Sequence, residues 1–136
     1  MKMNKFEGFT LVELIIVMVL LGILAAVAIP KMGNTISSSE EATEDAVIAA
    51  LKSAVELYAM DQVVNNSVKS YPYNPFDELD KTPNGYSGVG TLSDVDGEWV
   101  FFDDTPKFVA HQRNDNSKYK WFYVDSTGIF SGRLDY

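Results

Sequence analysis

The first pattern along the chain is an apolar run far longer than a buried strand. Between Phe9 and Ile29 the only residues that are not apolar are Thr10, Glu13 and Gly22. As a helix this run spans about 31 Å, roughly the thickness of a bilayer's hydrocarbon layer. The run therefore predicts a membrane-spanning helix at 9–30. Because a charge at a bilayer centre costs on the order of 3 kcal/mol, Glu13 is the first candidate for a functional residue.

Two residues are expected to weaken this helix. Pro30 has no amide proton, and its ring clashes with the carbonyl of Ala26, so a kink or local melting is expected there. Gly22 has a low helix propensity. The sequence therefore predicts weak points at Gly22 and Pro30.

A second, amphipathic pattern follows and predicts a continuation of the helix over 31–62. Apolar residues recur every three or four positions and form one helical face. They are Val47, Ile48, Leu51, Ala54, Val55 and Tyr58. The charged residues Glu44, Lys52, Glu56 and Asp61 are expected to point away from this face.

The polar stretch 34–41 leaves two interpretations open. The helix could run without a break from Phe9 to about Gln62, a length of roughly 80 Å. Alternatively, it breaks within this stretch, and Ser39 caps a fresh helix.

Residues 63–136 predict a small globular head. Prolines and glycines indicate a loop region at 63–97, and apolar, β-branched and aromatic runs predict strands at 98–102, 107–111, 119–124 and 129–134. The predicted fold class is α+β: a long N-terminal helix packed on a four-stranded antiparallel β-sheet at 98–136. The sheet should cover Val47, Leu51, Val55 and Tyr58, because so small a head has a marginal core by itself.

Composition narrows the possible chemistry. The formal net charge is −8, and no basic face suggests direct nucleic-acid binding. The 136 residues include no cysteine, which excludes a disulfide, a cysteine zinc site and a thiol nucleophile.

The segment Gly8-Phe9-Thr10-Leu11-Val12-Glu13 resembles the prepilin peptidase site of type IV pilins and of the related type II secretion pseudopilins. In both, a short polar leader ends in glycine, phenylalanine follows, and a glutamate stands four residues later in an apolar helix. The positions of Gly22 and Pro30 also match. The resemblance implies the pilin fold, a leader at 1–8, cleavage between Gly8 and Phe9, and N-methylation of Phe9. Ala25–Ala28 could mimic an ordinary signal-peptidase site, but the run is long enough to span a membrane.

The resemblance also implies a role for Glu13. Cleavage would give Phe9 a free α-amine, which in this family meets the glutamate of a neighbouring subunit. An amine and a carboxylate about 4 Å apart attract by up to roughly 4 kcal/mol at an effective dielectric near 20. Glu13 is therefore expected to act in assembly.

Charge also predicts how the chain sits in the membrane. Lys2 and Lys5 precede the apolar run, and the flank beyond Lys31 is acidic, so the N-terminus is expected in the cytoplasm. The resemblance then implies a single-pass protein of the bacterial inner membrane that moves into an extracellular pilus or a periplasmic pseudopilus. The implied partners are copies of this chain, prepilin peptidase, an inner-membrane assembly platform, and minor pilins or pseudopilins.

Two functions stay open. The first is a structural subunit of a type IV pilus-like filament that serves adhesion, motility or DNA uptake. The second is a pseudopilin of a type II secretion system that drives protein export. No catalytic signature accompanies either, so no enzymatic activity is expected.

The head offers lesser candidates. Asp94, Asp96 and Glu98 could form a calcium loop, although their spacing does not match an EF-hand and a solvated acidic turn is favoured. His111, the one histidine, is expected to be an ordinary strand residue, because no nucleophile elbow accompanies it. Asn65-Asn66-Ser67 matches a glycosylation sequon that arises often by chance. The aromatic residues are expected to form core and strand pairs.

Overall fold

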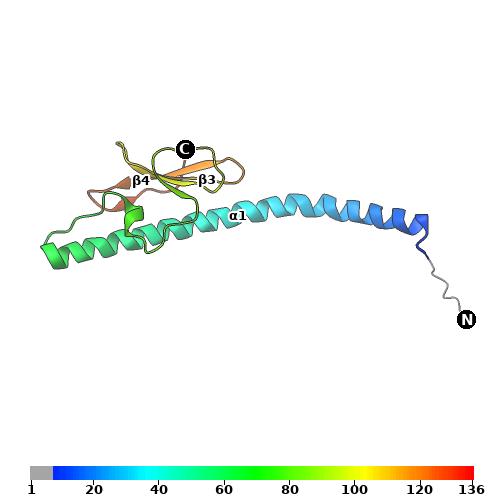
Figure 1. Cartoon of the computed structure of the whole chain (residues 1–136), viewed down its shortest axis with the longest axis horizontal. Coiled ribbons are helices and arrows are strands. Elements are labelled where there is room, and N and C mark those ends of the chain that lie inside the picture. Colours follow the sequence, from blue (N-terminus) through cyan, green and yellow to red (C-terminus); the bar gives the residue numbers. More distant parts are fainter. Residues whose placement is uncertain (1–7) are drawn as a thin grey trace, which may run out of the picture. The chain divides into compact units, whose positions relative to one another are not determined.

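The structure is a computed structural model that describes residues 8–136 (Figure 1). Most of the expected leader, residues 1–7, lies outside the described residues. The chain divides into two compact units, Met1–Ser39 and Glu40–Tyr136, and each is treated by itself below. The elements are α1 (Leu11–Asn66), the 3-10 helix η1 (Pro75–Glu78), β1 (Tyr86–Val89), β2 (Trp99–Phe102), β3 (Phe108–Gln112), β4 (Lys118–Val124), β5 (Ile129–Phe130) and β6 (Leu134–Asp135).

Helix α1 is continuous over the polar stretch that had left a break possible. The hydroxyl of Ser39 donates to the carbonyl of Thr35 at 2.8 Å, and that of Ser38 donates to the carbonyl of Asn34 at 3.0 Å. These hydroxyls bond the preceding turn and do not cap a new one. The interpretation of Ser39 as a helix cap is therefore wrong, and α1 ends at Asn66, a turn beyond the expected Gln62.

The helix also continues through its two expected weak points. Gly22 lies inside α1, and Pro30 is an internal helical residue. Neither residue ends the helix. Their expected weakening of the helix stays a prediction.

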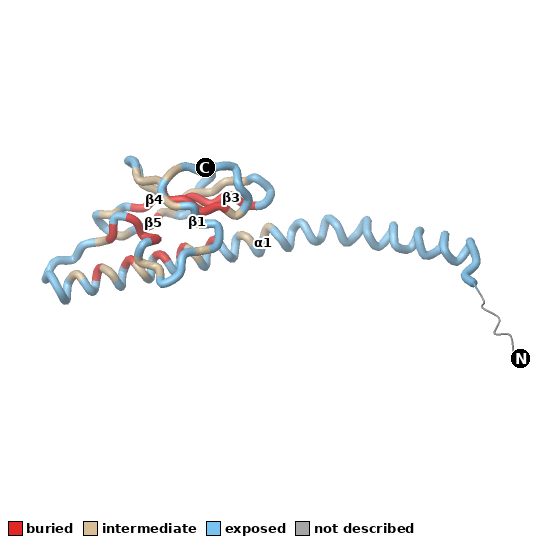
Figure 2. The backbone as a smooth tube through the Cα atoms, viewed as in Figure 1, coloured by how far each residue is buried: buried red, intermediate tan, exposed pale blue. Residues whose placement is uncertain are grey.

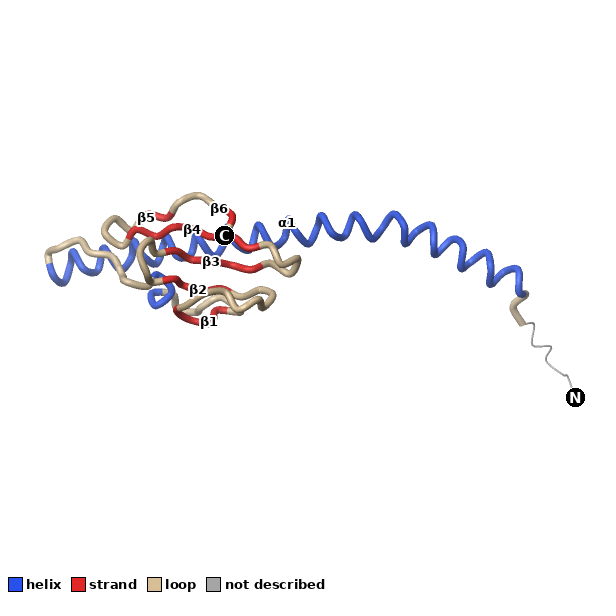
Figure 3. Tube along the Cα trace, turned by 90° about the horizontal axis from the view of Figure 1, so that it is seen from above, coloured by secondary structure: helices blue, strands red, loops and turns tan. Residues whose placement is uncertain are grey.

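The sheet has six strands, so the prediction of four was wrong. Strands β2, β3 and β4 form the expected antiparallel core of the sheet (Figure 3). β1 adds a parallel neighbour to β2, and β5 and β6 each pair with β4. The sheet is therefore mostly antiparallel.

Local backbone chemistry explains both differences. Gly85, which comes just before β1, has a φ of 85°, and a Cβ there would stand 2.1 Å from the carbonyl oxygen of Gly97. Only glycine permits this close crossing. The same glycine made the segment resemble a loop in the sequence, so β1 was not predicted. At the C-terminus, Ser131 binds the backbone of Phe122 with both its amide and its hydroxyl, which separates β5 from β6.

The core lies between the sheet and the part of α1 that belongs to the second unit (Figure 2). Leu51 and Val55 on α1 are fully buried, as expected, and Val47 is partly buried. From the sheet, alternating residues point to the same core: Trp99, Phe101, Val109, Trp121 and Tyr123. A helix of the second unit and one sheet face thus bury each other.

Truncation of the central core residue tests this packing. Leu51→Ala should lower the free energy of unfolding of the head by about 3 kcal/mol, because it removes buried methyl groups and leaves a cavity. Near-UV circular dichroism of the full chain in detergent, followed during urea unfolding, measures the loss. Leu57→Ala is the matched control, since Leu57 is 64% exposed on the same helix. Equal effects of the two substitutions would contradict the assigned core.

Candidate processing and assembly site

The segment expected to be processed stands just ahead of α1. Gly8 and Phe9 lie outside the helix, and Phe9 is 94% exposed. A peptidase needs an accessible peptide bond, and both Gly8 and Phe9 are exposed. Cleavage between them stays a prediction.

Glu13 is tied to the start of the helix. Its Oε2 accepts a hydrogen bond from the amide of Thr10 and another from the hydroxyl of Thr10, both at 2.8 Å. The amide of Glu13 in turn donates to the Thr10 hydroxyl at 3.3 Å. This reciprocal arrangement is a capping box, with Thr10 as the cap and Glu13 at the third helical position. The sequence carries the signal for this box, Thr-x-x-Glu before an apolar run, and the expected assembly role of Glu13 does not account for it.

The two oxygens of the Glu13 carboxylate therefore differ in their hydrogen bonds. Oε2 holds the cap, and among the described residues no hydrogen bond reaches Oε1. Glu13 can keep its cap and still offer one oxygen to a further donor.

The helix behind the cap presents apolar side chains on every side. An 18-residue window of α1 near the N-terminus has a mean hydropathy of 3.0 and is not buried at all. Its length and composition suffice to cross a membrane. Such a segment needs lipid or other protein around it.

Comparison with known proteins bears on this same segment. Residues 3–29 match the model of the prokaryotic N-terminal methylation motif. The type IV wide pilus major component PilA4 of Thermus thermophilus is 34% identical over 125 residues, which cover 82% of this chain and 91% of that protein. The chain belongs to the type IV pilin and pseudopilin family.

Other members of the family match a smaller share of this chain. The type IV major alpha-pilin of Moraxella bovis is 46% identical over 54 residues, which are 40% of this chain and 34% of that pilin. The type II secretion system core protein G of Vibrio cholerae is 36% identical over 63 residues, which are 46% of this chain and 43% of that protein. No solved structure matches the chain.

The acidic loop of this pilin-family head is organised by Glu98. The Glu98 carboxylate is buried and accepts hydrogen bonds from the Ser87 hydroxyl at 2.7 Å and the Ser93 amide at 2.5 Å. Burial raises the pKa of Glu98, but these hydrogen bonds outweigh it and lower the pKa overall. Asp94 pairs with Lys118. Within residues 8–136, no three acidic or histidine side chains gather as a metal site, and calcium binding by Asp94, Asp96 and Glu98 stays a prediction.

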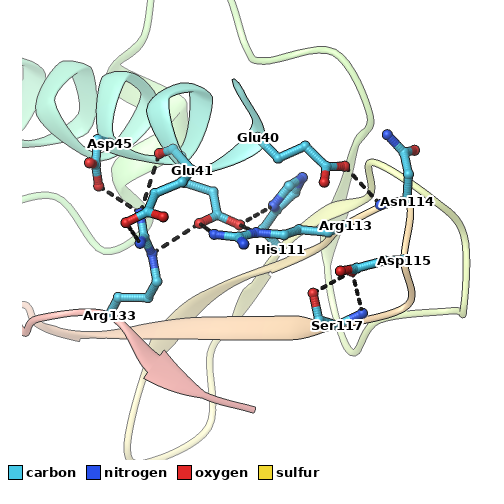
Figure 4. A network of polar contacts seen from close by, with 10 residues as sticks. Glu40, Glu41, Asp45, His111, Arg113, Asn114, Asp115, Ser117 and Arg133 are labelled. Carbon is cyan, nitrogen blue, oxygen red and sulfur yellow. Dashed lines mark hydrogen bonds and ion pairs between the residues drawn. The ribbon is translucent and has the colours of Figure 1, made fainter. Parts of the chain in front are cut away.

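His111 lies on β3, as expected, and it belongs to a buried ionic network (Figure 4). Its Nδ1 is 2.9 Å from Oε1 of Glu44, and its ring stacks on Trp99 with a centroid distance of 4.3 Å. Arg113 binds both oxygens of Glu44, at 2.8 and 2.7 Å. The Nε of Arg133 lies 3.0 Å from Oε2 of Glu44. One carboxylate on α1 thus meets three basic side chains from the sheet side.

The prediction that Glu44 points away from the core is wrong. Glu44 is fully buried, because positions 44, 48, 51 and 55 share one helical face. That spacing could have revealed it. The partners could not be read from spacing, because they come from the distant strand β3 and from the C-terminal segment.

Charge balance keeps Glu44 ionised. Burial raises the pKa of Glu44, but hydrogen bonds from Arg113 and His111, with the charges of Arg113 and Arg133, lower it below 4.5 overall. The same contacts raise the pKa of Arg113. Arg133 also pairs with two other carboxylates of α1. Its Nη1 lies 2.7 Å from Oε1 of Glu41, and its Nη2 lies 2.8 Å from Oδ1 of Asp45. The network therefore ties the C-terminal segment to α1.

The sign of this shift predicts acid sensitivity. A carboxyl whose folded-state pKa lies below 4.5 stabilises the fold above pH 4.5 and loses that contribution as pH falls through its folded-state pKa. The melting temperature of the wild-type head should fall as the solution is acidified below this pH. The substitution Glu44→Gln should lower the free energy of unfolding by about 3–5 kcal/mol at pH 7, because it leaves buried arginines unpaired. The stability of this variant should also depend less on pH in the acid range.

Thermal melts from pH 3 to 8, followed by near-UV circular dichroism, test the prediction on both proteins. Glu56→Gln is the matched control, because Glu56 is an exposed glutamate of α1 that pairs with Lys69 only at the surface. Parallel acid dependence in wild type and Glu44→Gln would contradict the assignment.

Proposed function

We propose that this chain is a structural subunit of a type IV pilus-like filament. In this proposal, prepilin peptidase cuts between Gly8 and Phe9, the new N-terminus of Phe9 is methylated, and the subunit polymerises through its N-terminal helix. The observation that carries the proposal is the exposed Gly8–Phe9 bond directly before an apolar helix whose capping box is formed by Thr10 and Glu13. The extent of the similarity to a pilus major component, over both helix and head, supports it.

The geometry of Glu13 suggests how processing leads to assembly. Cleavage creates an α-amine on Phe9, and Oε1 of Glu13 is the oxygen left open by the cap. An amine from a neighbouring subunit could reach Oε1 while Thr10 keeps Oε2. The attraction is worth up to roughly 4 kcal/mol at about 4 Å and an effective dielectric near 20. In lipid an unpaired amine is costly, so pairing favours the assembled state.

The proposal includes the organisation and surroundings of the subunit. We divide the chain into a leader at 1–8, a membrane and assembly helix at 9–30, its amphipathic continuation at 31–62, and the head at 63–136. Before assembly the subunit would lie in the bacterial inner membrane with Lys2 and Lys5 in the cytoplasm. Its partners would be copies of itself, prepilin peptidase, an assembly platform, and minor pilins or pseudopilins. Its role would be structural and not enzymatic.

The second candidate is a type II secretion pseudopilin. Similarity to core protein G of Vibrio cholerae favours it, but that similarity covers less than half of this chain. The pilus interpretation rests on similarity over 82% of it. We therefore favour a pilus subunit over a type II secretion pseudopilin.

Substitution of Glu13 separates pairing from capping. Glu13→Gln keeps a side chain that can complete the capping box, whereas Glu13→Val removes both cap and charge. If the charge pairs with Phe9, both variants should insert and be cleaved, and both should yield at least about tenfold fewer filaments. Filament yield is measured after shearing, and cleavage by the mass of the membrane-bound subunit. Wild-type yield from Glu13→Gln would show that Glu13 serves only as a cap.

Electron microscopy distinguishes the pilus from the pseudopilus. We expect sheared surface filaments whose main component, identified by mass spectrometry, is this chain beginning at Phe9. Deletion of the gene should remove those filaments. Surface filaments that persist without the chain, together with loss of protein export, would favour the pseudopilin.

A further inference from the structure

The side of α1 turned away from the sheet is a mostly apolar surface in the second unit, and Asp61 lies at its border. The side that faces the sheet is marked by the buried residues Glu44, Ile48, Leu51, Val55 and Ala59 (Figure 2). Eight small or apolar residues, all exposed, lie on the opposite side: Ala42, Ala46, Ala49, Ala50, Ser53, Leu57, Met60 and Val64. A contiguous exposed surface of this kind marks an interaction site more often than chance exposure does.

The two ends of this surface differ in shape. At its N-terminal end it is hollow, and a groove of about 450 Å³ is lined by Ala42, Thr43, Ala46, Val47, Ala50, Leu79, Lys81 and Pro83. We call this the alanine groove. At its C-terminal end large side chains project: Leu57 is 64% exposed, Met60 65% and Val64 81%. We call these three residues the apolar ridge.

The alanine groove and the apolar ridge match in length. Ala42 to Ala50 extends about 12 Å along the helix axis, and Leu57 to Val64 extends about 10 Å. Large side chains that enter a groove whose helical wall is mostly alanine give the close packing that helix contacts require. Residues 8–136 therefore carry both halves of a contact that these residues do not make with one another.

Charge complementarity favours a second copy of this chain as the occupant of the groove. Lys81 lines the alanine groove, and Asp61 directly follows Met60 of the apolar ridge in the sequence. Both are exposed, and neither has an ion-pair partner within the part of the chain that the structure describes. A copy that places its ridge in the groove brings an acidic residue toward an unpaired lysine. A partner of unrelated sequence is not needed to explain either feature.

We propose that the apolar ridge of one copy docks in the alanine groove of a second copy, with Asp61 facing Lys81 of that second copy. The centres of ridge and groove lie about 21 Å apart along the helix, at 1.5 Å per residue. Each copy therefore uses two different surfaces, and such a heterologous contact repeats as a ring or an open-ended array and does not stop at a dimer. The proposal rests on the proposed filament function and assigns the surface through which the heads of successive subunits meet.

Charge reversal tests the pairing in the full chain, expressed with its assembly machinery. Lys81→Asp and Asp61→Lys should each reduce sheared filaments by about fivefold, and the double variant should return to within about twofold of wild type. Lys52→Asp is the matched control, because Lys52 is an exposed lysine of α1 outside the alanine groove. Its filament yield should stay at the wild-type level.

Disulfide capture tests the same contact directly. The chain has no cysteine, so introduced thiols report only on the chosen positions. Cells that express Asp61→Cys and Lys81→Cys on separate copies should give a disulfide dimer under oxidation. Either variant alone should give much less, since like positions do not meet in a heterologous contact.

The outcomes separate this proposal from the filament proposal. Rescue in the double charge variant together with the mixed dimer supports the docking. Normal filaments from both single charge variants, with no mixed dimer, would overturn the docking and leave the filament function intact. Dimers formed by Asp61→Cys alone would also overturn it, because they indicate a symmetric contact. Absence of filaments from the wild type would count against the filament function itself.

Discussion

The buried carboxylate of Glu44 is the contact on which the arrangement of the head depends. An ionised carboxylate is expensive to remove from water unless basic groups meet it with good geometry. Arg113 binds it through two atoms, His111 meets one oxygen, and Arg133 approaches the other. A shift of α1 along the sheet by one turn would bury the charge without these partners. The network therefore selects one register of helix on sheet.

That register decides which surface of the helix stays exposed. Once Glu44, Leu51 and Val55 face the sheet, the side opposite to them must face outward. The outward side is the one that holds the alanine groove and the apolar ridge. An internal ionic contact thus determines which residues are available to other subunits.

The start of the helix uses a carboxylate in a different way. Glu13 completes a capping box with Thr10, and among residues 8–136 no hydrogen bond reaches its other oxygen, Oε1. Within a subunit the residue stabilises the first helical turn, where backbone amides otherwise lack partners. The same placement gives it a free oxygen close to the proposed cleavage site. One side chain can therefore serve both folding and assembly.

The sequence by itself determined the long helix, the family motif from Gly8 to Glu13, the three central strands and the core positions Leu51 and Val55. Each of these follows from local periodicity or a short motif. Tertiary structure alone decided the partners of Glu44, the addition of β1 and the division between β5 and β6. These features depend on residues that are distant in the chain, such as Arg113, or on a close crossing, such as that of Gly85 with Gly97. Periodicity can tell which face of an element is buried, but contacts between distant segments depend on how those faces are packed together.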